Sequence, residues 1–242
     1  MRTKSRRLAI LGLPVEVIRK DIKNLHVAVY PPAGRVRVAT PLRLTDDVVR
    51  VAVISRLGWI RRQQTRFADQ VRESQRELVT GESIYFRGRR FRLEIVEDPV
   101  RPRVRVANSS RIQLRCRRAT DRDQREAMLN QWYRERLREQ IPALLRKWER
   151  KVGVDVAEVR IRRMKTKWGS CNAQARRIWL NLELAKKPAS SLEYILVHEM
   201  THIHERRHSD RFREMMDGVM PGWQLHRAEL NRTPLAHEDW RY

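Results

Sequence analysis

The sequence predicts a protein of the α+β class. Between residues 24 and 114, short runs of alternating apolar and polar residues are separated by turn residues, a pattern typical of antiparallel strands. After residue 120, apolar residues recur at intervals of three and four, as on one face of a helix. The change of pattern predicts a β-rich region with a helix at residues 1–115 and a second region at 116–242. No internal repeat is apparent.

The opening residues imitate a signal peptide, because basic residues precede a short apolar run. However, Glu16 interrupts that run, Lys20 and Asp21 follow it, and no small-residue cleavage site is apparent. We therefore expect this segment to be part of the folded protein.

Three hairpins and one helical stretch are predicted in the first region. LHVAVY and RVRVAT flank the turn sequence PPAG, SIYFRGRRFRLEIV turns at Gly88, and VRVANSSRIQLRC forms a third strand pair. Residues 44–78 carry apolar side chains at helical spacing.

The second region should begin with a helix that Thr120 or Asp121 caps and Gly153 ends, with Pro142 kinking or dividing it. Residues 156–185 alternate on both sides of the loop sequence WGSCNAQARR, which predicts an antiparallel strand pair. Ser190 with Glu193 three residues later predicts a capping box at the start of the next helix.

Composition limits the function classes. The chain has 53 basic and 29 acidic residues, a net charge of +24 that attracts polyanions, so nucleic acid is a possible partner of its basic surface. Only nine basic residues are lysine and the arginines are spread along the chain, which genomic base composition would also produce. No uncharged apolar run approaches the roughly 18 residues of a membrane helix, so no membrane association is expected.

The two cysteines, Cys116 and Cys171, form no CxxC pair. This excludes a structural zinc ribbon, and two lone thiols favour a reducing, cytoplasmic location.

The segment VHEMTH contains a metal-binding pattern. His198 and His202 are four residues apart, so on a helix they project from one face and could bind one zinc ion. Glu199 is rotated by about 100° around the helix, where it can accept a proton from a water on the metal. This is the H-E-x-x-H arrangement.

The third ligand is chosen by geometry. His204 lies roughly 200° around the helix from His202 and should face away from the metal, while Glu205 lies too far along the axis and should pair with a neighbouring arginine. His208 becomes available if the helix ends first, and Ser209 can cap a new helix directly after it. We therefore favour His198, His202 and His208, which with one water form a catalytic arrangement.

The spacing H-E-x-x-H-x5-H also matches that of metzincin proteases. The glycine at which their chain turns is replaced here by Glu205. This substitution speaks against a metzincin assignment, although the distance to the third histidine is preserved.

The stretch from Lys165 to Phe212 resembles the YgjP-like family of zinc metallopeptidases, relatives of the SprT and minigluzincin-type proteases. The matching features are WGSC at 168–171, LNLELA, VHEMTH, and His208-Ser209 followed by Phe212. The N-terminal hairpins extend the resemblance to about residues 24–232. The resemblance implies a zincin-like core with active-site helices beside a small antiparallel sheet. It also implies His198, His202 and His208 as zinc ligands, with Glu199 as catalytic base.

In zincin-like folds a sheet edge lies beside the metal, where a peptide can dock as an added strand. WGSC would lie at one end of that edge, where Ser170 or a backbone donor could stabilise the oxyanion. The alternative is structural, with Trp168 in the core and Gly169 in a turn, and is slightly favoured. Cys171 is not expected to be a nucleophile, because no histidine accompanies it.

Two functions remain in competition. The first is a zinc-dependent hydrolase, most simply a peptidase acting on peptides or proteins. The second is a basic nucleic-acid-binding protein with a structural or vestigial metal site. The two combine in a protease that acts on proteins bound to nucleic acid.

Overall fold

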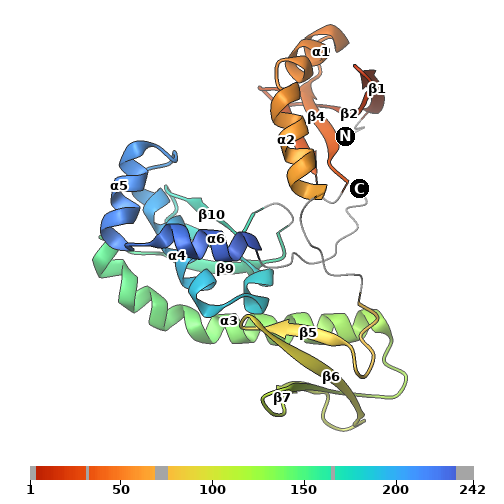
Figure 1. Ribbon diagram of the computed structural model, residues 1–242, viewed down its shortest axis with the longest axis vertical. Coiled ribbons are helices and arrows are strands. Elements are labelled where there is room, and N and C mark those ends of the chain that lie inside the picture. The colour runs from red at the N-terminus through yellow and green to blue at the C-terminus, as the bar shows by residue number, and fades with distance from the viewer. Residues whose placement is uncertain (1–3, 31–32, 69–75, 165–166, 233–242) are drawn as a thin grey trace. The chain divides into compact units, whose positions relative to one another are not determined.

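The computed structural model describes residues 4–30, 33–68, 76–164 and 167–232 (Figure 1). The chain divides into two compact units, Met1–Glu73 with Pro234–Tyr242, and Ser74–Thr233. Residues 115 and 116, between which the sequence pattern predicts a change of region, both lie in the second unit.

The first unit contains one four-stranded sheet and two helices. Its elements are β1 (Lys4–Ile10), β2 (Leu13–Lys20), β3 (His26–Tyr30), β4 (Arg35–Pro41), α1 (Asp46–Ile54) and α2 (Leu57–Ala68). The opening residues form the β1–β2 hairpin, and the predicted β3–β4 hairpin is confirmed. The predicted long helix is two helices instead, because α1 ends at the C-cap Ser55, and residues 69–75 lie outside the described part.

The second unit contains a four-stranded sheet, a long helix, a three-stranded sheet and three further helices. The first sheet comprises β5 (Ser83–Phe86), β6 (Arg89–Glu97), β7 (Arg103–Val106) and β8 (Arg111–Cys116). The remaining elements are α3 (Arg122–Val152), β9 (Glu158–Arg162), β10 (Gly169–Asn172), β11 (Arg177–Asn181), the 3-10 helix η1 (Leu182–Lys186), α4 (Ala189–His204), α5 (Asp210–Val219) and α6 (Trp223–Arg232). This mixture confirms the predicted α+β class.

The two four-stranded sheets have the same topology, with strand orders β1-β2-β4-β3 and β5-β6-β8-β7. In each, two antiparallel pairs are joined through a parallel central pair. The first hairpin of each sheet turns on two successive residues with positive φ, the second of them glycine: Leu11-Gly12 and Arg87-Gly88. Positive φ at both positions is typical of the type I′ hairpin turn. The structure therefore contains a repeated arrangement that the sequence does not reveal.

The second of these sheets belongs to the same core as the candidate site. The backbone N–H groups of Arg87 and Gly88, at the β5–β6 turn, donate to the carbonyls of Ala185 and Lys186 in η1. A Cβ on Gly88 would lie 2.8 Å from the ring of Pro188, so the turn and the start of α4 are in close contact. The β5–β6 hairpin thus supports the start of the helix that carries His198 and His202.

Helix α3 runs without interruption from Arg122 to Val152 (Figure 1). Asp121 caps its start in a capping box with Gln124, and Gly153 ends it with φ of 74°. The expected division at Pro142 is wrong. Buried residues on both sides of the proline, among them Ile141 and Trp148, hold the two halves in one core, which offsets the lost hydrogen bond.

The three-stranded sheet has the order β10-β11-β9. Strands β10 and β11 pair antiparallel, but β9 and β11 pair in parallel, so the predicted antiparallel pair of residues 156–185 is wrong. The WGSC segment, which the sequence predicts to lie in a loop, instead supplies most of the edge strand β10, which follows β9 and precedes β11 along the chain. The final strand ends at Asn181, whose side chain bonds the backbone of Met164, Lys167 and Glu183 and starts η1.

Helix α4 begins at Ala189 after Pro188, and the predicted capping box of Ser190 and Glu193 is wrong. The Ser190 hydroxyl instead donates to Glu229 of α6, while Glu193 accepts hydrogen bonds from Lys147 and from the Trp148 indole of α3. Both side chains therefore bond to neighbouring helices and do not form the predicted capping box. Among the helices of the described residues, none is long and apolar enough to cross a membrane.

Candidate metal centre

Helix α4 lies in the centre of the second unit. Its apolar residues Leu192, Leu196, Val197 and Met200 are almost completely buried. The same helix carries His198 and His202, which are only partly buried. The buried side of α4 fixes the helix, and the two imidazoles project from it one turn apart.

The chain turns sharply after α4 and brings a third histidine back. The helix ends at His204, and its C-cap Glu205 is extended, with φ of −130°. Ser209 then caps α5, where its hydroxyl accepts a hydrogen bond from the Phe212 backbone N–H at 3.3 Å. His208 stands between the two helices. Because Glu205 turns with a negative φ, the glycine of the metzincin pattern is not required here.

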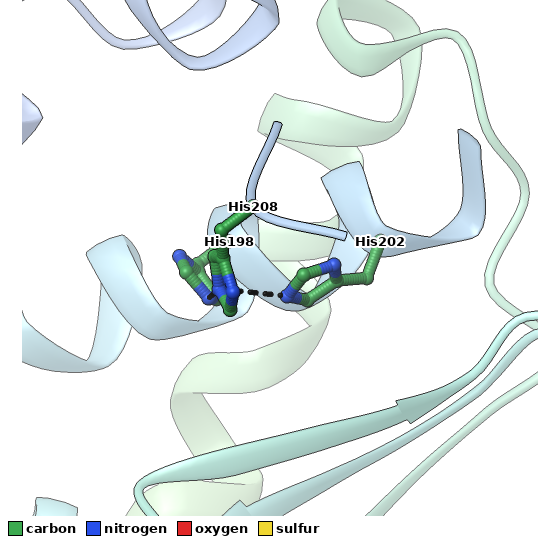
Figure 2. Close-up of side chains that lie close together, drawn as sticks. All are labelled: His198, His202 and His208. Carbon is green, nitrogen blue, oxygen red and sulfur yellow. Dashed lines mark hydrogen bonds between the residues drawn. The ribbon is translucent and has the colours of Figure 1, made fainter. Parts of the chain in front are cut away.

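The rings of His198, His202 and His208 converge (Figure 2). The Nε2 atom of His208 lies 3.2 Å from Nε2 of His202 and 3.0 Å from Nε2 of His198. Zinc–nitrogen distances of 2.0–2.1 Å in a tetrahedral site would separate two ligand nitrogens by roughly 3.3 Å. The separations therefore suit three nitrogens bound to one small cation.

The hydrogen bonding of the rings also fits a metal. Nδ1 of His202 lies 2.9 Å from the carbonyl oxygen of Glu205 and must donate to it. The neutral ring then has its lone pair on Nε2, directed toward the other two histidines. Neutral rings are favoured, since burial and the neighbouring His202 and His208 lower the pKa of His198 to about 3. Burial, His202 and Arg227 also lower the pKa of His208.

Glu199 is 6% exposed and lies against strand β10. A Cβ on Gly169 would be 2.5 Å from its Oε1 atom. Burial raises the pKa of Glu199 to about 8, against the opposing effect of Lys167. Helix α4 thus holds a carboxyl group of raised proton affinity at the residue after His198.

Phe212, Tyr194 and Arg227 surround the cluster and were not predicted as parts of it. The Phe212 ring lies 4.6–5.0 Å from each of the three imidazoles and limits their movement. Tyr194 meets His198 edge-on and stacks on Trp223 of α6. The sequence does contain an indication of the Tyr194 contact, because Tyr194 is four residues before His198 and the two rings therefore lie on one face of the helix. Arg227 of α6 acts on the site electrostatically, and no sequence spacing indicates it.

His204 and Glu205, which the sequence does not favour as metal ligands, lie outside the histidine cluster. Nε2 of His204 donates to the carbonyl of Val152, at the end of α3, at 3.0 Å. The Glu205 carboxylate accepts a hydrogen bond from the Arg207 backbone N–H, so the expected salt bridge to an arginine side chain is wrong.

The WGSC segment lies beside Glu199. Gly169 is part of strand β10 rather than of a turn, and its missing side chain makes room for the carboxyl group. Ser170 follows on the opposite face of the strand, paired with Trp179, which directs its hydroxyl away from Glu199. This placement gives no support to the suggested oxyanion role of Ser170. Burial and Glu199 raise the pKa of Cys171 to about 11, which keeps it an inert thiol.

Three converging imidazoles with an adjacent buried carboxyl group define the class of metal-dependent hydrolases. The chain belongs to the YgjP-like family, since residues 23–233 match the family described as "YgjP-like, metallopeptidase domain". It is therefore a metal-dependent peptidase domain by family.

Among solved structures, the chain is similar to the metallopeptidase zymogen abylysin of Pyrococcus abyssi. The two share 23% sequence identity with a TM-score of 0.34, over 39% of this chain and 99% of abylysin. No curated protein matches the chain.

Proposed function

We propose that the protein is a zinc-dependent peptidase with His198, His202 and His208 as metal ligands and Glu199 as general base. The observation that carries the proposal is the convergence of three Nε2 atoms, with His208 at 3.0 Å and 3.2 Å from the other two. Three neutral imidazoles suit zinc, and three protein ligands leave a coordination position for water. When bound, the zinc ion supplies Lewis acidity and lowers the pKa of that water.

Glu199 is the proton acceptor of the proposed reaction. It takes a proton from the water as the water attacks the scissile carbonyl, and it can return that proton to the leaving amine. Burial raises the pKa of this carboxyl group to about 8, and a cation bound at the three imidazoles would lower it toward the ionised form that accepts the proton. The contact with Gly169 fixes the carboxyl group between α4 and β10.

Strand β10 provides the proposed docking edge for a peptide substrate. In the described part of the chain it has one strand neighbour, β11, so its other edge can accept an extended peptide through backbone hydrogen bonds. Because Gly169 in this strand touches Glu199, a peptide docked there passes beside the general base. Backbone N–H groups of β10 remain the candidates for oxyanion stabilisation.

The proposal is tested by metal content and proteolysis together. Purified protein from zinc-replete expression should contain one zinc per chain by mass spectrometry and should cleave an unfolded protein substrate. Glu199→Gln should keep the zinc and lose cleavage by at least about a hundredfold, while His208→Ala should lose the zinc. His204→Ala is the matched control, because its ring lies outside the cluster, and it should retain both. A wild-type protein without zinc would contradict the proposal.

The alternative of nucleic-acid binding rests on the net charge of +24 alone. The comparisons give it no support, and the family is one of metallopeptidases. We also infer zinc rather than another divalent cation from the all-imidazole donor set.

A further inference from the structure

A hollow lies at the three-stranded sheet, where Ser170 and Trp179 share one face. It has a volume of about 580 Å³ and is lined by Arg134, Ile161, Arg162, Arg163, Met164, Ser170 and Trp179. It is separate from the three histidines, because Gly169 faces Glu199 and the next residue, Ser170, faces the opposite side.

The lining of this hollow is strongly basic. Three of its seven described residues are arginines and none is acidic. Arg163 is paired with Glu126 of α3. Within the described ranges Arg134 bonds the neutral side chain of Gln131, and Arg162 is exposed. An anionic group in the hollow would therefore meet guanidinium donors without a competing carboxylate in the lining.

Trp179 forms part of the wall of the hollow. Its indole Nε1 is buried and has no hydrogen-bond partner among the described residues. The rest of the Trp179 side chain is partly exposed and lines the hollow. The Ser170 hydroxyl on the neighbouring strand offers a donor.

The hollow begins at the strand on which the peptide is proposed to dock. On an added strand, the residue directly opposite Ser170 projects its side chain to the same face as Ser170. That side chain enters the hollow, while its neighbours along the peptide project toward α4 and Glu199. Since Gly169 touches Glu199 and Ser170 is the next residue, this substrate position lies close to the scissile bond.

We propose that the hollow formed by Arg134, Arg162, Ser170 and Trp179 is a specificity subsite for an acidic side chain of an extended peptide substrate. The subsite rests on the proposed peptidase function, which supplies the docking strand. The acidic side chain accepts hydrogen bonds from the guanidinium groups of Arg134 and Arg162 and from the Ser170 hydroxyl. The enzyme thereby selects peptides with aspartate or glutamate near the cleaved bond.

The test measures peptide binding apart from cleavage. Zinc-loaded Glu199→Gln protein, full length, is titrated with fluorescent peptides in which glutamate, glutamine or lysine is placed at each position in turn. We expect one position at which glutamate binds about tenfold more tightly than glutamine, as for a charge-assisted hydrogen bond, and lysine more weakly than both. Arg162→Ser, alone and with Arg134→Ser, should abolish this preference. Arg103→Ser, an exposed arginine of strand β7, is the charge-matched control and should keep it.

Several results would overturn the subsite. They are equal affinities for the three peptides at every position, a preference that survives in the Arg134/Arg162 double variant, and no peptide binding at all. Inorganic phosphate serves as a further probe. If it binds as tightly as the acidic peptide and with the same sensitivity to Arg162→Ser, the hollow is a site for a free anion. If wild-type protein fails to cleave while the glutamate preference persists, the subsite stands and the peptidase function fails.

Discussion

Gly169 and Glu199 are in contact across the gap between strand β10 and helix α4. An ideal Cβ on Gly169 would lie 2.5, 2.7 and 2.9 Å from Oε1, Cγ and Cδ of Glu199. The glycine has no positive φ, so its role is the space that it leaves and not a special backbone conformation. The position of Glu199, the proposed general base, therefore depends on the absence of a side chain thirty residues earlier.

Gly169→Ala tests this contact. The added methyl group cannot be accommodated without moving the Glu199 carboxyl group, so kcat should fall by at least about tenfold through misplacement of the base. Zinc content should be unchanged, since the histidines are not displaced. Cys171→Ala, two residues along the same strand, is the control for a general disturbance of β10. Full activity of Gly169→Ala would show that Glu199 has room to move.

Cys171→Ala should itself retain activity within a few-fold. Burial, together with Glu199, raises the pKa of its thiol to about 11, so the thiolate is scarce at neutral pH. Alkylation by iodoacetamide should be much slower at pH 8 than for a model thiol, and should accelerate as the pH approaches 11. Rapid alkylation at pH 7 that stops cleavage would contradict this assignment.

Ser209→Ala should weaken both the fold and the metal site. The hydroxyl caps α5, and loss of such a cap costs about 1 kcal/mol in the free energy of unfolding. Because His208 is the residue before Ser209, a frayed helix start should also lower the affinity for zinc. Urea unfolding and competition with a zinc chelator measure the two effects. Ser190→Ala is the matched control, because that hydroxyl caps no helix.

Glu193 should make the stability of the protein sensitive to acid. Burial raises its pKa, but hydrogen bonds from Lys147 and Trp148 outweigh burial and hold the pKa below the ordinary value of 4.5. A group whose pKa is lower in the folded state contributes stability above its unfolded pKa and loses it as the pH falls further. The Tm difference between wild type and Glu193→Gln, measured without metal, should therefore be largest at neutral pH and shrink below pH 4.5. A difference independent of pH would contradict this.

The local features of the site could be predicted from the sequence, because helical periodicity and capping act over a few residues. The four-residue spacing placed His198 and His202 on one face, and Ser209 indicated where the next helix begins. The contact of Gly169 with Glu199 could not be predicted, because it depends on how β10 packs against α4.

Two errors have the same origin in tertiary contacts. The Ser190–Glu193 pattern matches a capping box, but Glu229 and Trp148 provide partners that are distant in sequence. Strands β9 and β11 alternate as a hairpin would, but alternation does not distinguish parallel from antiparallel pairing. In the structure, β10 lies between β9 and β11 along the chain and pairs antiparallel with β11, so that β9 and β11 run parallel.

The shared strand order of the two four-stranded sheets has a consequence for folding. Tandem arrangements of one topology within a chain can exchange equivalent strands and misassemble. Here the inward-facing residues at equivalent places differ in bulk, with Val15 and Val17 in one sheet and Phe91 and Leu93 in the other. Strand β6 in the place of β2 would overfill the core of the first sheet, and β2 in the place of β6 would leave the core of the second sheet underfilled. The difference in bulk therefore disfavours exchange of the two hairpins.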